Sequence, residues 1–520
     1  MELMKRNIHM DALRGKASMQ MTLEDDVIIS DSKPDVAKLI LDRGNVVIEE
    51  IKVSDDHVNV KGMLEFFVLY RAEGRGNGKA DVADMSGTIP FDETVFMEGV
   101  KGGDDVSVDW ELEDLSISMI NSRKIRVQSL ICLSAVSREL YDEEIAVDLY
   151  SEEPVEFRKK TVNAVIMTVN KKDVFRVKEE VEIPGSFPNI LSVIWWEIRP
   201  QALEFKILED KISLQGEWKV FFLYRGEGEE TEICHYETTL PFAGTLECQG
   251  LREGMIPEIK YRAENRELEV RPDFDGEERI ITFEECLELD ICIYEEEQLN
   301  ILSDVYGVNK EVSTLVKDTE LKSLQNRCNG KVKVSDQFSV REEGVMLQKI
   351  LHSSYDLQIS GQSALEEGAE ITGTVKVRVF YQSSNEEDPY GMVEGSIPFV
   401  YVLEAAGMDR ACICPVHAFV DQMTVAIIDS GEIDIKCVLF FQANIYRREQ
   451  EKIIEQIQVS EPDKEVLSGL PGIAVYMVKE GESLWDIGKR YYVTIEALKQ
   501  MNELTSDEVR AGDKILVVKG

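Results

Sequence analysis

The sequence predicts a mainly β protein made of three tandem β-sandwich or barrel-like repeats, followed by a small C-terminal βααβ module. Two observations lead to this prediction. A strand-like segment with a fixed glycine-to-tyrosine spacing occurs three times in the 520 residues, and the last fifty residues change to a helical pattern between short apolar runs. At roughly 100–200 residues per domain, a chain of this length has room for several domains.

The repeated segment covers residues 60–71, 214–225 and 371–381. Each copy keeps a distance of eight residues from its glycine to its tyrosine, in the pairs Gly62 and Tyr70, Gly216 and Tyr224, Gly373 and Tyr381. An apolar-Pro-Phe triplet follows each copy, at 89–91, 240–242 and 397–399. Self-similarity of this kind indicates three copies of one domain.

A second shared element lies upstream of the first two copies. Pro34-Asp35 and Pro188-Asn189 each come 28 residues before the glycine, whereas the third copy has Val345-Met346 there and has diverged. We also expect short helices, such as residues 34–41, to decorate the β repeats.

Within the repeated segment, large side chains alternate with the period of a β-strand. Gly216, Trp218, Val220, Phe222 and Tyr224 share one face, as expected of a strand that buries that face. The opposite face carries Phe221 and Leu223. These two residues predict a second covered surface on the same strand. Many short strands at this spacing favour a sandwich or barrel.

The repeats and the intervening turn residues divide the chain into five parts. We expect a first repeat over residues 1–145, a second over 146–305 and a third over 306–455. Residues 456–471, rich in charge, proline and glycine, are typical of a linker. The C-terminal module then covers residues 472–520.

The charge balance limits the classes of partner. Lys and Arg number 58 against 99 Asp and Glu, a net charge of −41, which would repel nucleic acid and anionic lipid. The acidity keeps a large protein soluble or suits a basic partner protein. The N-terminal residues lack a continuous apolar stretch, and no apolar run reaches about 18 residues. We therefore expect no export signal, no membrane insertion and a cytoplasmic protein.

The sequence offers little material for catalysis or metal binding. Its five histidines are spread over separate repeats, and its nine cysteines share no spacing. Cys412, Cys414 and His417 form the one cluster with metal-ligand residue types, but zinc sites need a second ligand pair. We expect buried reduced thiols, no metal, no cofactor and no enzyme, although the many carboxylates leave a glycoside-hydrolysing pair open.

The C-terminal segment has a recognisable pattern. Residues 476–502 read YMVKEGESLWDIGKRYYVTIEALKQMN, and the chain closes with VRAGDKILV. Ser483 with Asp486, and Thr494, are suited to cap two helices, and Gly481 and Gly512 are suited to turns. These residues resemble the LysM family closely. The resemblance implies a compact βααβ fold.

In LysM modules the sugar lies against the loops after the first strand and the second helix. The resemblance thus implies binding residues Gly481, Glu482, Ser483, Leu484, Trp485, Met501, Asn502, Glu503 and Leu504. This copy departs from the family at Glu482-Ser483, where Asp-Thr is usual, and at Val517-Val518, where Ile-Pro is usual. We expect Trp485 to be a core residue rather than a sugar platform.

Several β repeats joined to one terminal LysM module resemble the SPOCS-domain family of clostridial spore-coat morphogenesis proteins. The Gly-to-Tyr strand, the Pro-Phe triplet and Pro34-Asp35 carry this resemblance. It implies a non-enzymatic adaptor or scaffold of the mother-cell cytoplasm, which localises and encases coat at the forespore surface. The implied partners are the coat-anchoring ATPase, stage IV sporulation protein A, bound through the LysM module, and other coat proteins.

Two alternatives remain open from the sequence. The first is a cell-wall hydrolase that carries a LysM module, or a cell-wall protein that binds peptidoglycan or N-acetylglucosamine through that module. The second is an abundant structural coat protein that associates through exposed strand edges.

Overall fold

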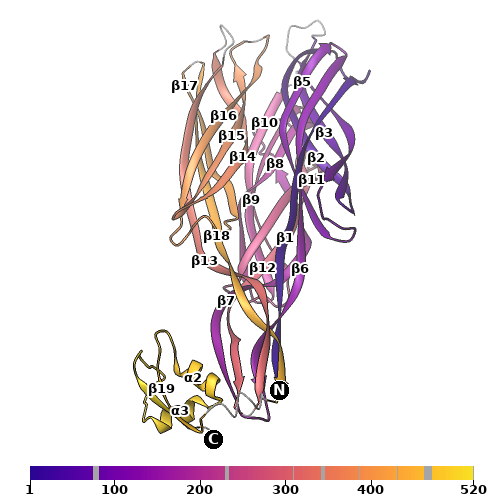
Figure 1. The fold of residues 1–520 in the computed structure, drawn as a ribbon. Coiled ribbons are helices and arrows are strands. Elements are labelled where there is room, and N and C mark those ends of the chain that lie inside the picture. The colour runs from indigo at the N-terminus through magenta and orange to yellow at the C-terminus, as the bar shows by residue number, and fades with distance from the viewer. Residues whose placement is uncertain are drawn as a thin grey trace.

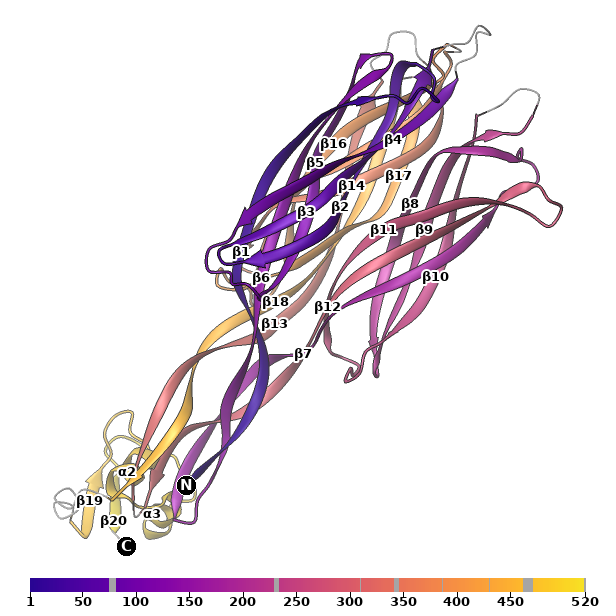
Figure 2. The same ribbon diagram turned by 90° about the vertical axis from the view of Figure 1, so that its right-hand side faces the viewer.

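The computed structural model describes residues 1–73, 81–228, 233–308, 310–340, 346–385, 387–429, 431–461 and 471–518, without the side chains of residues 265 and 266. Three β-rich repeats lie together at one end of an elongated molecule (Figure 1). Long strands continue from them as a twisted stalk, and the C-terminal module sits at the far end of the stalk (Figure 2).

Each repeat is a sandwich of two three-stranded antiparallel sheets. The first repeat has one sheet in the order β2-β3-β4 and one in the order β1-β6-β5. Its strands are β1 (Glu2–Ile28), β2 (Val36–Ser54), β3 (His57–Ala72), β4 (Val82–Phe96), β5 (Asp105–Asn121) and β6 (Lys124–Tyr150). The mainly β fold predicted from the sequence is confirmed.

The second and third repeats follow the same plan, with sheets β10-β9-β8 and β11-β12-β7, then β14-β15-β16 and β13-β18-β17. The second repeat consists of β7 (Val155–Glu182), β8 (Ile190–Leu208), β9 (Lys211–Gly226), β10 (Ile233–Glu247), β11 (Ile256–Pro272) and β12 (Glu278–Gly307). The third consists of β13 (Glu311–Ser339), β14 (Leu347–Leu365), β15 (Gly368–Ser383), β16 (Tyr390–Glu404), β17 (Val416–Asp429) and β18 (Glu432–Ser460).

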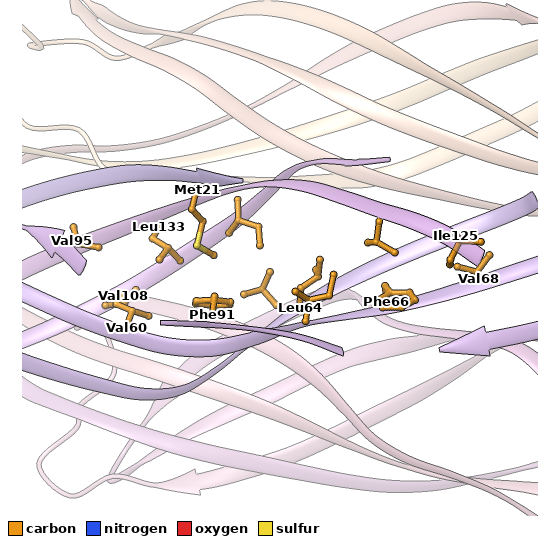
Figure 3. Close-up of a cluster of buried hydrophobic side chains, with 14 of the residues drawn as sticks. Met21, Val60, Leu64, Phe66, Val68, Phe91, Val95, Val108, Ile125 and Leu133 are labelled. Atoms are coloured by element: carbon orange, nitrogen blue, oxygen red, sulfur yellow. The ribbon is translucent and has the colours of Figure 1, made fainter. Parts of the chain in front are cut away.

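Each sandwich encloses its own apolar core. In the first repeat, Leu64, Phe66 and Val68 project from β3 toward Ile125 and Leu133 of β6 (Figure 3), and all five are fully buried. The second and third repeats have separate clusters of the same kind. The alternating side chains of the repeated segment therefore form the inner face of β3, β9 and β15.

The recurrence of the glycine together with the Pro-Phe triplet has a steric origin, because the two are paired across the sheet. In the sheet register, Gly62 faces Phe91, Gly216 faces Phe242 and Gly373 faces Phe399. A Cβ atom added to Gly62 would lie 2.7 Å from Cζ of Phe91 and would collide with the carbonyl oxygen of Val47. The aromatic ring thus covers the glycine, and no side chain fits beneath it.

The tyrosine that ends the repeated segment binds the upstream proline. The hydroxyl of Tyr70 donates a hydrogen bond to the carbonyl oxygen of Pro34 at 3.0 Å, and that of Tyr224 to Pro188 at 3.2 Å. This contact explains why the proline and tyrosine keep a constant separation in the first two repeats. In the third repeat, residue 345 lies outside the described residues.

The second face of the repeated segment is also buried, as predicted. Phe221 and Leu223 of β9 are at most 1% exposed. They join one cluster with Leu69 of β3, Phe380 of β15 and other residues of all three repeats. The three repeats therefore pack around a shared apolar centre. Their central strands are covered on both faces.

Beside this shared apolar centre, a group of charged side chains joins the second and third repeats. The ring of His352, from β14, stacks on Phe221 with centroids 4.1 Å apart. Its Nδ1 lies 2.8 Å from a carboxylate oxygen of Glu237, and Glu197 lies on its other side, where it also pairs with Arg199. Burial opposes the charged imidazole, but both carboxylates counter it and raise the pKa of His352.

The stalk is built from the extended ends of three antiparallel strand pairs, β1 with β6, β7 with β12, and β13 with β18. Its inside is filled by apolar residues of all three pairs, including Ile8, Ile145, Val162, Ile301, Leu321 and Ile453. β6, β12 and β18 run past residues 145, 305 and 455, where the sequence suggested boundaries. Residues 456–460 of the expected linker belong to β18, and 462–470 lie outside the described residues.

The expected helix at residues 34–41 is not formed. Residues from Val36 onward belong to β2 instead. The helices within the described ranges are α2 (Leu484–Tyr491) and α3 (Ile495–Met501) of the C-terminal module. Register shifts occur between Val36 and Lys38 and between Leu39 and Leu41. These bulges break the alternation, so that Val36 faces the sandwich core while Leu41 faces the shared centre. The resulting apolar run imitates a helical pattern.

Replacing Gly62 with alanine is expected to destabilise the first repeat by about 1–3 kcal/mol, because the added Cβ overpacks the site. Urea unfolding followed by circular dichroism would measure this loss. The control is Gly102→Ala, because a Cβ there meets nothing closer than 3.8 Å. Equal unfolding midpoints for the two variants would contradict the steric explanation.

The contact between the second and third repeats should weaken as the pH rises. The raised pKa of His352 means that its stabilisation is complete below its unfolded pKa, near 6.5, and is lost as the pH passes the folded value. We expect the wild-type protein to lose stability between pH 6 and 8.5 relative to His352→Gln. Urea unfolding at both pH values measures this loss, with His57→Gln as the control, because His57 is half-buried and lies outside this contact.

Candidate functional site

The C-terminal module folds as the sequence predicts. A two-stranded sheet, β19 (Ile473–Met477) with β20 (Lys514–Val518), packs beside α2 (Leu484–Tyr491) and α3 (Ile495–Met501). The N–H of Ser483 donates to the carboxylate of Asp486 at 2.8 Å, and the hydroxyl of Thr494 accepts from Ala497 N–H at 3.2 Å. The two helices therefore begin where the capping residues predict. Gly481 and Gly512 adopt positive φ angles of 81° and 94° at the turns.

The module is docked on the tip of the second strand pair of the stalk. Asp304, near the end of β12, accepts a hydrogen bond from the indole N–H of Trp485 at 2.8 Å. Its carboxylate also pairs with Nζ of Lys489 at 2.7 Å. One carboxylate thus binds two residues on successive turns of α2, because residues four apart share a helix face.

Aromatic and cationic contacts complete this docking. Tyr306 meets the ring of Trp485 edge-on, with centroids 4.8 Å apart, and its hydroxyl donates to the carbonyl oxygen of Val493 at 2.9 Å. The guanidinium carbon of Arg158 lies 4.6 Å from the centroid of the Trp485 ring, within cation–π range. Glu156 accepts a hydrogen bond from the backbone of Ile495.

The first predicted binding loop, residues 481–485, is largely occupied within the protein. Leu484 is buried in the core of the module. Trp485 is 3% exposed, but the stalk rather than the module's own core covers it. Glu482 accepts from the hydroxyl of Tyr476 and pairs with Arg490 at 3.0 Å. These bonds lower the pKa of Glu482, Tyr476 first among them.

The second predicted loop, residues 501–504, divides into structural and exposed positions. The side-chain amide of Asn502 donates to the carbonyl oxygens of Leu498 and Leu516, each at 2.8 Å, and accepts from Leu516 N–H. It therefore ties α3 to β20. Leu504 packs against the core of the module, whereas Met501 is 39% exposed and Glu503 is exposed with a φ of 54°.

The outer face of β19 presents an additional apolar surface. Ile473, Val475 and Met477 are 67%, 65% and 59% exposed. Alternate residues of a strand share one face, so these three side chains form a continuous stripe. The alternation of these residues is visible in the sequence, but which face of the strand is exposed depends on how the module packs.

The cysteine cluster with metal-ligand residue types belongs to the core of the third repeat. Cys412 and Cys414 are buried in the core of the third repeat, and burial raises the pKa of Cys414 to about 11. All nine cysteines are free thiols. Among the described residues, no group of three or more His, Cys, Asp and Glu side chains is placed to hold a metal ion. Neither described helix is long and apolar enough to cross a membrane.

A small cavity of about 60 Å³ lies between the second and third repeats, lined in part by Glu197, Arg199, Lys219, His352 and Asp421. It has room for a few water molecules. We assign it to the interface between the repeats, because each of these charged groups is paired with another side chain of the protein.

Asp304→Ala is expected to release the module from the stalk. The change removes both hydrogen bonds to α2 and leaves the indole N–H of Trp485 without its acceptor, which costs about 1–3 kcal/mol. Small-angle scattering should show a larger radius of gyration, and the amide of Ile495 should exchange faster. Asp173→Ala is a matched control because Asp173, within β7 and away from the tip, makes the same bond to the following backbone N–H. Unchanged scattering would contradict this assignment.

Comparison with known proteins also finds three repeated domains followed by a different C-terminal domain. The family described as SipL, SPOCS domain matches residues 35–120, 189–271 and 347–428, one segment in each repeat. The LysM domain family matches residues 476–518. Both are families of binding domains rather than catalytic domains.

A curated relative resembles the module alone. The probable peptidoglycan endopeptidase LytE of Bacillus subtilis (strain 168) is 51% identical over 45 residues, which are 9% of this chain and 13% of that protein. The chain thus spans about one eighth of the length of this relative. No solved structure matched the chain. With three SPOCS repeats followed by a LysM domain, the chain belongs to the SPOCS-domain family of sporulation proteins.

Proposed function

We propose that this protein is a non-enzymatic adaptor of spore-coat morphogenesis. In this proposal it acts in the mother-cell cytoplasm and at the forespore surface, where it helps to localise and encase the coat. Its LysM domain binds the coat-anchoring ATPase, stage IV sporulation protein A, and its repeats contact other coat proteins. The family assignment supplies the sporulation context.

The observation that best supports an adaptor is the separation of its two binding parts. The repeats cluster at one end, and the LysM domain sits at the other end of the stalk (Figure 1). The apolar interior of the stalk comes from all three strand pairs, which makes it a stiff spacer. Two partners held at opposite ends would therefore be kept a fixed distance apart.

The surface available to the partner is the exposed part of the LysM domain. We propose that the two predicted loops contribute through Gly481, Met501 and Glu503, since their other residues are engaged within the protein. The apolar stripe of β19 extends the exposed surface. Residues 472–520 contain seven basic and eight acidic side chains, so the domain lacks the strong negative charge of the repeats.

Peptidoglycan binding is the second candidate function, favoured by the 51% identity to the corresponding segment of LytE. The docking bears against it in one respect. Trp485, the aromatic side chain in the first sugar-binding loop, is buried against Tyr306 and Arg158. A sugar ring would have to bind without stacking on this indole.

Isothermal titration calorimetry with the full-length chain distinguishes the two functions. We expect binding to stage IV sporulation protein A with a dissociation constant in the micromolar range or below, and no heat with N-acetylglucosamine oligomers or peptidoglycan fragments. Met501→Glu should weaken binding to the ATPase about tenfold, because it places a charge in an apolar contact.

The control for this substitution is Met119→Glu, because Met119 is 46% exposed on the first repeat. It should leave both titrations unchanged. Binding of the oligosaccharides alone would refute the adaptor function and support the cell-wall function. ATPase binding that Met501→Glu does not affect would move the contact away from the second loop.

A further inference from the structure

The three strand pairs of the stalk end in the same way. Each contains one extra residue, a bulge, just before its tip: Val147 in β6, Ser303 in β12 and Glu455 in β18. The register beyond the bulge then pairs Met4 with Asp148, Arg158 with Asp304, and Leu315 with Gln456. The three tips can therefore be compared residue by residue.

The first tip repeats the chemistry of the tip that binds the LysM domain. Asp148 and Tyr150 occupy the positions of Asp304 and Tyr306, and in both tips a glutamate faces the tyrosine across the ladder. These facing pairs are Glu2 with Tyr150 and Glu156 with Tyr306. Three of the four side chains that hold the LysM domain are therefore present twice.

The local backbone of the two aspartates also agrees. Leu149 N–H donates to the carboxylate of Asp148 at 2.9 Å, and Val305 N–H donates to Asp304 at the same distance. Lys159 adds an ion pair at 3.0 Å to Asp148. These hydrogen bonds, from Lys159 first, lower the pKa of Asp148 and keep it charged. Asp148 is thus held ready to accept hydrogen bonds, as Asp304 does.

The two tips differ in what covers them. Tyr306, under the LysM domain, is 3% exposed, whereas Tyr150 is 61% exposed and Met4 beside it 55%. The first tip thus leaves exposed the tyrosine that the LysM domain covers at the second tip. The only sequence difference within the four-residue set is Met4 in place of Arg158.

We propose that Glu2, Met4, Asp148 and Tyr150 form a second docking site for a LysM domain, filled by the LysM domain of a second copy of this chain. In this complex Asp148 accepts from the indole of the incoming Trp485 and from Lys489. Tyr150 donates to the carbonyl oxygen of Val493. Met4 contacts the indole through its thioether, a favourable sulfur–aromatic contact.

Both tips of one chain can be filled at the same time only by two LysM domains, and because each chain has one, the domain at the first tip then comes from a second copy. The face carrying Trp485 and Lys489 is used once, and in the structure it contacts Asp304. The domain that fills the first tip must therefore have left its own second tip. Tethering gives that tip an effective concentration in the millimolar range. Exchange is thus expected between chains that are crowded together or whose second tip is blocked.

The third tip lacks this chemistry and supplies a natural control. Gln456 and Gln458 stand at the positions of the aspartate and the tyrosine, and Ser313 faces Gln458 across the ladder. It offers neither a carboxylate for Lys489 nor an aromatic ring for Trp485.

The test mixes a donor and an acceptor, both full-length. The donor carries Asp148→Ala, Tyr150→Ala, Asp304→Ala and Tyr306→Ala, so its LysM face is free and its own tips cannot bind. Wild-type chain is the acceptor, and sedimentation velocity measures the complex. We expect a complex of one donor with one acceptor, abolished when the donor also carries Trp485→Ala.

The acceptor variants locate the site. Asp148→Ala with Tyr150→Ala should weaken the complex at least tenfold, while Gln456→Ala with Gln458→Ala should leave it unchanged. Absence of a complex at several hundred micromolar, or equal binding to all acceptors, would overturn the proposal. Circular dichroism verifies that each variant is folded, and Tyr150→Ala alone serves if the double variant is not.

A photoreactive amino acid at Met4 gives a measurement independent of these variants. In the acceptor mixed with donor, it should cross-link to donor residues 484–495 in a product of two-chain mass. A one-chain product would show that the chain's own LysM domain reaches the first tip, and would overturn the assignment to a second copy. Cross-links to any other part of the donor would overturn the site.

Discussion

The burial of both faces of one strand in every repeat determines the rest of the architecture. The central strands β3, β9 and β15 place one face in a sandwich core and the other in the centre shared by the repeats. A sandwich alone would cover only the first face. The apolar second face therefore obliges the three repeats to associate. Once they do, the ends of their outer sheets are brought together and continue as one stalk.

Charged side chains also lie in the interface between the repeats. Arg43 of the first repeat lies 4.8 Å from the ring centroid of Phe67 and 5.6 Å from that of Trp195, and donates to the carbonyl oxygen of Trp196 at 2.9 Å. Burial raises the pKa of Glu285 to about 8, so it is largely neutral at pH 7. Charges here are paired, stacked or neutralised, which limits the cost of their burial. Such directional contacts fix how the repeats meet, a task that apolar packing performs less specifically.

The sequence predicted those features that depend on neighbours along the chain or on repetition. The strand alternation, the second covered face of β9 and the helix caps at Ser483 and Thr494 are of this kind. The bulges near Val36 produced an apolar run that resembled a helix, because a bulge moves side chains to the other face of a sheet. The docking of Trp485 on Asp304 and Tyr306 joins residues about 180 positions apart, and no periodicity signals such a pair. The one sign of this docking in the sequence is the recurrence of Asp-x-Tyr at 148–150 and 304–306.

The three strand pairs of the stalk differ at their tips, and this difference decides where the LysM domain binds. Three similar strand pairs would end in three equivalent tips if the repeats were identical. Substitution has instead left a glutamate, an aspartate and a tyrosine at two tips and glutamines at the third. Only the second tip adds Arg158, whose cation–π contact with Trp485 distinguishes it from the first. The position of the LysM domain thus follows from a few tip residues, while the fold beneath them stays the same.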